Sequence, residues 1–482
     1  MPSAALARPR PRTDAASVDG VQAALAYARA NGGRFVEELK ALVRFPSVGS
    51  EPAHAAEVRR CAAWLAAHLD SLGLRARLVE TSGHPLVRAD WRGAPGRPTL
   101  LVYGHYDVQP ADAADGWHSP PFEPTLRGDA LYGRGASDDK GQLWAHVKAV
   151  ESWLRTAGRL PVNLVFLFEG EEESGSGGML GYLARRGPSL GADAAVISDM
   201  PMRDARTPAI TLSMRGTLGM EIEVRGPSHD LHSGIFGGAV ANPLHVLSDL
   251  VARLHGDDGR VAIPGFYDAV ALLPPAERAA LRRAGPDDAE MLREAGLSAG
   301  WGEPGWTEYE RTTLRPSVDV HGIAGGYAGD GVKAVIPTRA AAKLSFRLAP
   351  GQDPARVERL VRRWVAATPV PGARVRVRTL SRARPVRVDA RHPAVAAAAG
   401  AARAAFGRAP VFVRSGGTLP VAAVLSADLG LPVVLMGFAL RDDGMHAPDE
   451  KMHLPIFHRA VETSIRMLAA MSRLSPSRTG RR

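Results

Sequence analysis

Helical and strand spacings of apolar residues alternate along the chain up to about residue 213. Residues 34–43 have helical spacing and end before Pro46, which stops a helix. Residues 51–72 continue as a second amphipathic helix that closes at Gly73. Residues 162–168 are instead an unbroken apolar run, which is typical of a strand buried on both faces of a sheet. This alternation predicts an α/β layered domain. The same reasoning predicts strands at 75–79, 86–91, 99–103 and 194–197, and helices at 140–154 and 179–185.

The pattern changes after about residue 214. Residues 218–224 alternate between apolar and polar positions as a half-buried strand does, and residues 240–254 are helical. Residues 257–313 are rich in glycine, proline and charge, which indicates an irregular or helical insertion. Two strand–helix–strand units then complete a small α+β domain with its own sheet. Its further elements are strands at 317–322, 341–348 and 374–380 and a helix at 353–366.

The α/β character returns after residue 383, with helices at 393–406, 420–429 and 456–472 and strands at 411–413 and 432–436. We therefore predict an α/β fold class, in which a main domain with a central mixed sheet flanked by helices is interrupted by the inserted α+β domain. The predicted boundaries are a disordered leader at 1–19, the main domain at 20–213 and 383–475, the inserted domain at 214–382 and a disordered tail at 476–482.

The composition narrows the function classes. The formal net charge is +10, but the arginines are scattered or lie near the two ends and do not interleave with aromatic residues. We therefore predict solvated basic surfaces and no nucleic-acid partner. No apolar run approaches the length of a membrane span, and the first residues lack the apolar core of a secretory signal, so no membrane partner is expected. The single cysteine, Cys61, lies in a helical run, and a cytoplasmic location fits this usage.

Acidic residues and histidines gather where apolar runs end. Because ligands bind beyond the carboxyl ends of strands in open α/β sheets, these clusters are expected to converge on one crevice. They are His105 and Asp107 after residues 100–103, Asp138 and Asp139 after 131–134, Glu169 and Glu171–Glu173 after 162–168, Asp199 after 194–197, and Asp442, Asp443 and His446 after 432–438.

Several carboxylates in one crevice would repel one another and take up protons, so a divalent metal is expected among them. Ligation by histidine and carboxylate without cysteine suits zinc, with manganese or cobalt as alternatives. Two ions bridged by a carboxylate and a water need two histidines and three carboxylates, which leaves one glutamate as a general base. Taken singly, His105 could be a core histidine, residues 171–173 a solvated face and residues 138–139 a helix N-cap. Their joint placement after buried strands favours the metal site.

The motifs resemble the carnosinase and cytosolic dipeptidase branch of the dinuclear zinc peptidases, a superfamily that also holds acetylornithine deacetylase, succinyl-diaminopimelate desuccinylase and glutamate carboxypeptidase. The resemblance covers about residues 30–472. It rests on YGHYDVQPADAADGWHSPPFEP, LYGRGASDDKG, FEGEEESGS, ISD, DLHSG, HGIAGGYAGDGVKAVIP, FRLAP, RSGGTLP and DDGMHAPDEK.

The resemblance implies a role for each residue of the metal site. His105, Asp138 and Asp199 would hold one ion, and Asp138, Glu173 and His446 would hold the other, with Asp138 bridging. Glu172 would be the general base, and Asp107 would orient His105. The peptide bond after Asp138 is expected to be cis.

The resemblance also makes the main domain catalytic and the inserted domain a ferredoxin-like lid and dimerisation domain. It implies a homodimer, because the histidine that matches His232 reaches the partner subunit's active site and stabilises the oxyanion. Arg347 would bind the substrate carboxylate. The loop of Gly416, Gly417 and Thr418 would cradle the same end of the substrate.

We therefore predict a dipeptidase or short-peptide hydrolase. Two departures bear on the substrate: Ser415 stands where this branch commonly has glutamate, and Glu171 stands where it has an apolar residue. The first departure puts recognition of a free amino group in doubt and leaves open an N-acyl amino acid deacylase of the same superfamily. A catalytically inactive scaffold would have lost at least one ligand position, and none is lost here.

Overall fold

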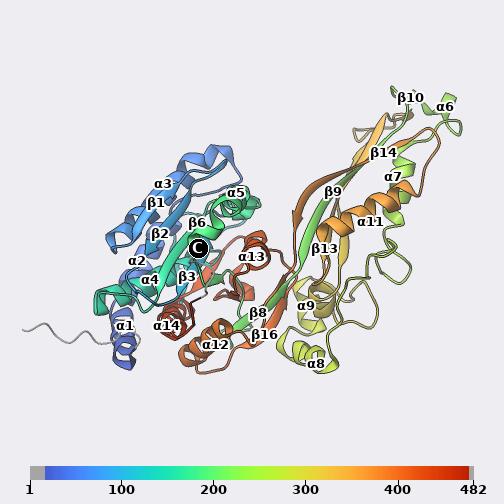
Figure 1. The fold of residues 1–482 in the computed structure, drawn as a ribbon. Helices are drawn as coiled ribbons and strands as arrows, with labels where there is room; N and C mark the ends of the chain where they lie inside the picture. The colour runs from blue at the N-terminus through green and yellow to red at the C-terminus, as the bar shows by residue number, and fades with distance from the viewer. Residues whose placement is uncertain (1–16, 477–482) are drawn as a thin grey trace, which may run out of the picture. The chain divides into compact units, whose positions relative to one another are not determined.

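The computed structural model describes residues 17–476, which fold into two compact units (Figure 1). Of the described residues, the first unit comprises 17–210, Asp389–Val411 and 428–476, and the second comprises Thr211–Val388 and Phe412–Ala427. The inserted domain predicted at 214–382 lies within the second unit. That unit also contains residues 412–427, which the sequence places in the main domain, because the strand β16 (Val411–Ser415) pairs with β8 (Ala209–Met214).

The first unit is built on a mixed sheet flanked by helices, which confirms the predicted fold class. The strand order is β1-β2-β6-β3-β7-β17, in which the pairs β1–β2 and β2–β6 are antiparallel and the pairs β6–β3, β3–β7 and β7–β17 are parallel. Every residue of β3 is buried. The bounds are β1 (Arg75–Val79), β2 (Leu86–Trp91), β3 (Thr99–His105), β6 (Asn163–Glu169), β7 (Ala194–Ser198) and β17 (Val433–Met436).

Helices α3, α4 and α12 pack on this sheet, and α14 packs in turn on α4 and α12. α4 is buried from Lys140 to Trp153, because it is covered by α1 and α14 as well as by the sheet. The helices of this unit are α1 (Val18–Ala30), α2 (Gly32–Val43), α3 (Ala55–Ser71), α4 (Lys140–Ala157), α5 (Gly177–Arg186), α12 (Pro393–Phe406) and α14 (Leu454–Met471).

The chain enters its first helix earlier than predicted. The disordered leader was expected to reach residue 19, but α1 begins at Val18, and the Ser17 hydroxyl caps it by accepting from the Gly20 amide at 3.2 Å. Burial of Ala24, Leu25 and Ala28 stabilises this helix. The rest of the predicted leader, residues 1–16, and the tail at 477–482 lie outside the described residues.

A second, small sheet of the first unit joins the segment before Asp138 to the segment after His446. Its order is β18-β5-β4, and β18 (Lys451–His453) runs antiparallel to β5 (Ala130–Tyr132), which pairs with β4 (Thr125–Arg127). The segments before and after this pairing therefore lie side by side although they are far apart in the sequence. No helix in the described part of the chain is long and apolar enough to cross a bilayer.

The second unit contains the predicted ferredoxin-like arrangement. Its antiparallel sheet has the order β11-β13-β9-β14, and α7 and α11 pack on it. Apolar residues of β9 alternate inward and share a core with both helices. The bounds are β9 (Gly216–Arg225), α7 (Pro243–Ala252), β11 (Ser317–Gly325), β13 (Arg339–Leu348), α11 (Pro354–Ala366) and β14 (Arg374–Ala383); the insertion carries α8 (Pro275–Ala284), α9 (Asp288–Glu294) and α10 (Glu308–Thr313).

Candidate metal centre

Three parallel strands of the first sheet end beside predicted ligands. β3 ends at His105, β7 ends at Ser198 just before Asp199, and β6 ends at Glu169 shortly before Glu172. β3 pairs in parallel with both β6 and β7, so the three carboxyl ends meet at one edge of the sheet. The convergence predicted from strand ends is therefore present.

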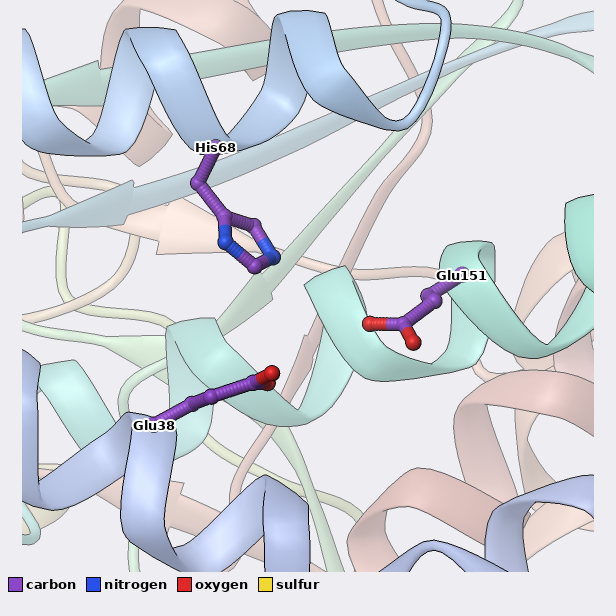
Figure 2. Close-up of side chains that lie close together, drawn as sticks. All are labelled: Glu38, His68 and Glu151. Atoms are coloured by element: carbon purple, nitrogen blue, oxygen red, sulfur yellow. The ribbon is translucent and has the colours of Figure 1, made fainter.

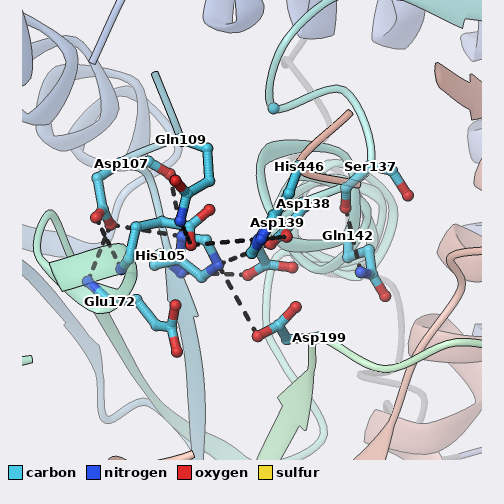
Figure 3. A network of polar contacts seen from close by, with 12 residues as sticks. His105, Asp107, Gln109, Ser137, Asp138, Asp139, Gln142, Glu172, Asp199 and His446 are labelled. Atoms are coloured by element: carbon cyan, nitrogen blue, oxygen red, sulfur yellow. Dashed lines mark hydrogen bonds and ion pairs between the residues drawn. The ribbon is translucent and has the colours of Figure 1, made fainter. Parts of the chain in front are cut away.

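Asp138 lies between two imidazoles at this edge (Figure 3). Its Oδ1 is 3.1 Å from Nε2 of His105, and its Oδ2 is 3.1 Å from Nε2 of His446. The same nitrogen of His446 is 3.3 Å from Oε2 of Glu173, while Nε2 of His105 is 3.9 Å from Oδ2 of Asp199. One carboxylate therefore connects two clusters of possible ligand atoms.

The clusters are two groups of three side chains whose ligand atoms lie within 4.8 Å of one another. They are His105, Asp138 and Asp199, and Asp138, Glu173 and His446. These are the two ligand sets that the family resemblance implies, with Asp138 shared. The donor set, imidazole nitrogen and carboxylate oxygen without sulfur, fits zinc or a similar divalent ion.

The charges at this edge also fit bound cations. Burial, reinforced by the charge of Asp138, raises the pKa of Asp199 well above its usual range. Burial raises the pKa of Glu172 to about 7, and neighbouring Glu173 adds to the shift. Without a positive ion the edge would hold protons on carboxylates, and divalent cations would let these groups stay ionised. The residues present therefore fit a pair of divalent metal ions.

The side chain of Asp139 does not cap the helix that follows it, which argues against the interpretation of residues 138–139 as a helix N-cap. Asp139 occupies the N-cap position of α4, but its side chain makes no capping hydrogen bond. Its Oδ2 instead accepts from the backbone N–H of His105 at 3.2 Å. The peptide bond between Asp138 and Asp139 is cis, as the resemblance implies.

Asp107 contacts both sides of the cluster. Its Oδ1 lies 3.4 Å from Nδ1 of His105, and its backbone oxygen lies 3.0 Å from the same nitrogen. Its two carboxylate oxygens also accept from the backbone amides of Glu172 and Glu173, at 3.2 and 3.1 Å. The sequence predicts the contact with the histidine but not the support of the glutamate turn.

Gln109 is a further contact that the sequence analysis did not single out. Its side-chain amide donates to Oε2 of Glu173 at 2.7 Å, the oxygen that also faces His446. The signal was available, because Gln109 belongs to the same GHYDVQP stretch as His105 and Asp107. Its amide can hold the glutamate in position without adding charge.

A further group with metal-like spacing, outside this edge of the sheet, has a different explanation. Glu38, His68 and Glu151 point toward a common centre (Figure 2). The ammonium of buried Lys148 supplies the positive charge there, at 2.5 Å from Glu38, 2.7 Å from Glu151 and 2.9 Å from Nε2 of His68. Trp144 covers the ammonium with its ring at 4.2 Å. Lys148 donates to Glu151 and contacts Nε2 of His68, and it lies at ion-pair distance from Glu38, so this group is a buried salt-bridge network.

The residues expected to bind the substrate carboxylate form a cluster in the second unit. Nη1 of Arg347 donates to the Thr418 hydroxyl at 3.2 Å, and that hydroxyl donates to the backbone oxygen of Arg215 at 2.7 Å. Arg215 also donates to the backbone oxygen of Gly416 at 3.2 Å. Burial, together with the nearby charge of Arg347, lowers the pKa of Arg215 to about 10. Two adjacent guanidinium groups favour an anion, and Arg215 was not predicted.

The GGT loop is shaped by its glycines and by Ser415. A Cβ at Gly416 would lie 2.4 Å from the backbone oxygen of Thr312, so no larger residue fits there. The Ser415 hydroxyl accepts from the Gly417 amide at 3.1 Å. Ser415 therefore stabilises the turn, a contact that explains how serine is accommodated at this position.

His232 ends the short strand β10 (Leu231–His232) in the second unit, and its side chain is exposed. Its Nδ1 accepts from the Gly234 amide at 3.0 Å. In the neutral ring this acceptor role leaves Nε2 as the protonated, donating nitrogen. A donor is what stabilisation of an oxyanion requires.

Comparisons with known proteins agree with this geometry. Residues 101–470 match the model of peptidase family M20/M25/M40. The chain is 30% identical over 465 residues to the Cys-Gly metallodipeptidase of Candida albicans, covering 89% of this chain and 93% of the relative. It is 32% identical over 443 residues to the Beta-Ala-His dipeptidase of Homo sapiens, covering 87% of this chain and 86% of the relative.

Solved structures give the same picture. Human carnosine dipeptidase 1 superposes with a TM-score of 0.79 at 30% identity, over 94% of this chain and 99% of that one. The M20 family metallo-carboxypeptidase of Sulfolobus solfataricus superposes with a TM-score of 0.82 at 31% identity, over 91% of this chain and 99% of that one.

Proposed function

Because the chain belongs to peptidase family M20/M25/M40, we propose that it hydrolyses the amide bond of dipeptides and short peptides with two divalent metal ions. The chain is thus a metallopeptidase. The observation that carries the proposal is the sharing of Asp138 by two groups of ligand atoms, next to the turn that bears Glu172.

In this proposal His105, Asp138 and Asp199 hold one ion, and Asp138, Glu173 and His446 hold the other. The ions would supply Lewis-acid polarisation of the scissile carbonyl and of the attacking water. Glu172 takes a proton from that water and later gives it to the leaving amine. Asp107 keeps Glu172 in place, because its carboxylate accepts a hydrogen bond from the backbone amide of Glu172.

The second unit supplies the groups that recognise the substrate. Arg347 binds the terminal carboxylate, and Thr418 and the backbone of Gly416 and Gly417 complete this subsite. His232 donates from Nε2 to the developing oxyanion of a site in the partner subunit. The support is the guanidinium cluster of Arg215 and Arg347 and the acceptor role of His232 Nδ1.

The N-acyl amino acid deacylase alternative is not supported, because the relatives described above are named as dipeptidases.

A second candidate function, carboxypeptidase action on short peptides, is favoured by one observation. The structural neighbour from Sulfolobus solfataricus is named a metallo-carboxypeptidase. Ser415 fits this candidate, since a carboxypeptidase needs no contact with a free amino group.

The substrate panel that separates these activities contains dipeptides, the same peptides with a blocked amino group, and N-acetyl amino acids. The proposal expects cleavage of the free dipeptides by the zinc-loaded chain. Equal cleavage of blocked peptides would assign carboxypeptidase action. Cleavage of N-acetyl amino acids alone would contradict both peptidase assignments.

We further propose zinc as the metal, a cytoplasmic location and a homodimer formed through the second unit. The metal proposal rests on the donor set, and the location on the buried, unpaired Cys61, which requires no oxidising compartment.

For the dimer, β11 is an edge strand of its sheet and exposes Val320 and Ile323, which are 40% and 56% accessible. An exposed apolar edge strand favours pairing with another chain. Light scattering on Ile323→Lys measures the effect, with a shift from dimer to monomer as the expected result.

A further inference from the structure

Glu450 is a fully buried carboxylate that contacts the loop of Asp138, although the two residues lie far apart in the sequence. Its Oε1 accepts from the backbone amides of Ser137 and Asp138, both at 2.9 Å. Its Oε2 accepts from the Gly135 amide and from Nη1 of Arg134, both at 2.8 Å. Four donors thus converge on one side chain, and one of them is the backbone of the shared ligand.

Only an ionised carboxylate can satisfy this set of donors. Each oxygen accepts two hydrogen bonds, and an amide would place an NH₂ group against one pair of donors. The Arg134 guanidinium balances the charge, and the side chains of this ion pair are 4% and 0% exposed. The arrangement has no need of a bound ion of its own.

Glu450 also connects this loop to the one that carries His446. It lies just before β18, whose Lys451 pairs with Tyr132 of β5, and its backbone oxygen accepts from the Gly133 amide at 2.9 Å. The side chain and the backbone of Glu450 therefore both contact the segment that leads to Asp138.

A second side chain also joins the loop of Asp138 to the loop of His446. Oδ2 of Asp443, also buried, accepts from the Ser137 hydroxyl at 2.9 Å and from the Leu440 amide at 2.7 Å. His446 follows Asp443 closely in the chain, so the two loops are joined on both sides of the histidine.

We propose that Glu450 is a positioning residue that fixes the backbone of Asp138 relative to His446, and so sets the affinity of the metal pair. This inference rests on the proposed function. Asp138 belongs to both ligand groups, but only one group also contains His446. Loss of the Glu450 carboxylate is therefore expected to weaken both ions and to weaken the ion of the His446 group more.

The test measures Zn²⁺ affinity of the metal-depleted full chain by competition with a chromogenic chelator. Glu450→Gln is compared with wild type, and His446→Ala marks the titration step of its own group. Supporting groups around metal ligands typically change affinity 10- to 100-fold, and a loss of that size is expected here. Glu450→Asp, which keeps the charge on a shorter side chain, is expected to fall between wild type and Glu450→Gln and serves if the amide variant does not fold.

The matched control is Glu310→Gln in the second unit. Glu310 is equally buried and accepts from Arg278, Arg282 and the Thr307 amide. Its substitution is expected to lower thermal stability and leave both Zn²⁺ steps unchanged. Folded Glu450 variants with wild-type affinity at both steps, or an equal loss of affinity in Glu310→Gln, would overturn the inference. A wild-type chain that binds two Zn²⁺ without cleaving dipeptides would contradict the proposed function alone.

Discussion

The carboxylate of Asp107 accepts a hydrogen bond from the backbone amide of Glu172 at 3.2 Å. Through this contact a buried aspartate on one loop fixes the glutamate turn of another. The position of the proposed general base therefore depends on a residue that need not touch the substrate.

Asp107→Asn tests this dependence. The amide retains one acceptor oxygen but turns an NH₂ group toward a backbone donor, so the glutamate turn should shift. We expect kcat for a dipeptide to fall about 10- to 100-fold with a smaller change in KM. Asp112→Asn is the control, because Asp112 caps a surface turn and is exposed. An unchanged kcat in zinc-saturated Asp107→Asn would contradict the role.

Arg347→Met removes one of the two guanidinium groups proposed to attract the substrate carboxylate. A charge-assisted hydrogen bond contributes about 1.5–3 kcal/mol, so kcat/KM should fall about 10- to 100-fold. The loss should be expressed mainly in KM and should disappear for a substrate whose carboxylate is amidated. Arg339→Met, at an exposed position of the same strand, should leave the kinetics unchanged. Equal losses on both substrates would show that Arg347 does not read the carboxylate.

His146 links the stability of the first unit to pH. It is buried between the hydroxyls of Ser198 and Ser464, at 2.8 and 3.0 Å, and burial lowers its pKa to about 4. The unfolded chain binds a proton near pH 6.5, whereas the folded chain does not until about pH 4. Stability is therefore complete above about pH 6.5 and decreases as the pH falls toward 4, by about 3 kcal/mol from this residue.

His146→Gln can bond both hydroxyls without titrating, so its urea midpoint should fall less steeply between pH 6.5 and 4 than that of wild type. His245→Gln, at an exposed position, provides the comparison and should follow the wild-type slope. Parallel slopes for wild type and His146→Gln would rule out the contribution of His146.

Although Asp138 follows β5 of the separate antiparallel sheet, much of the metal cluster could be predicted because its other ligands follow buried strands of one parallel set, whose carboxyl ends meet. β3 and β6 show this most simply, since their apolar runs lead directly to His105 and to the turn of Glu172. The separate sheet of the second unit could be predicted from its own pattern, since β9 alternates in burial as its sequence alternates in polarity.

Other contacts depend on partners that a local pattern does not contain. Arg215 follows an apolar strand, and only the fold brings it to Arg347 and Gly416. The assignment of residues 412–427 likewise depends on the pairing of β16 with β8, which a short strand pattern does not specify. The sequence analysis predicts no helix at the position of α1, because its small apolar residues give a weak helical signal until they pack on α4 and α14.

The central claim is that Glu172 moves protons for a metal pair which it does not itself hold. The most direct measurement is Zn²⁺ stoichiometry together with dipeptide turnover in Glu172→Gln. We expect two bound ions with affinities near those of wild type and a kcat lowered at least about 100-fold, the lower end of the range that general-base catalysis contributes. Wild-type turnover in the zinc-loaded variant would contradict the assignment of the base. Loss of the ions together with turnover would instead place Glu172 among the ligands.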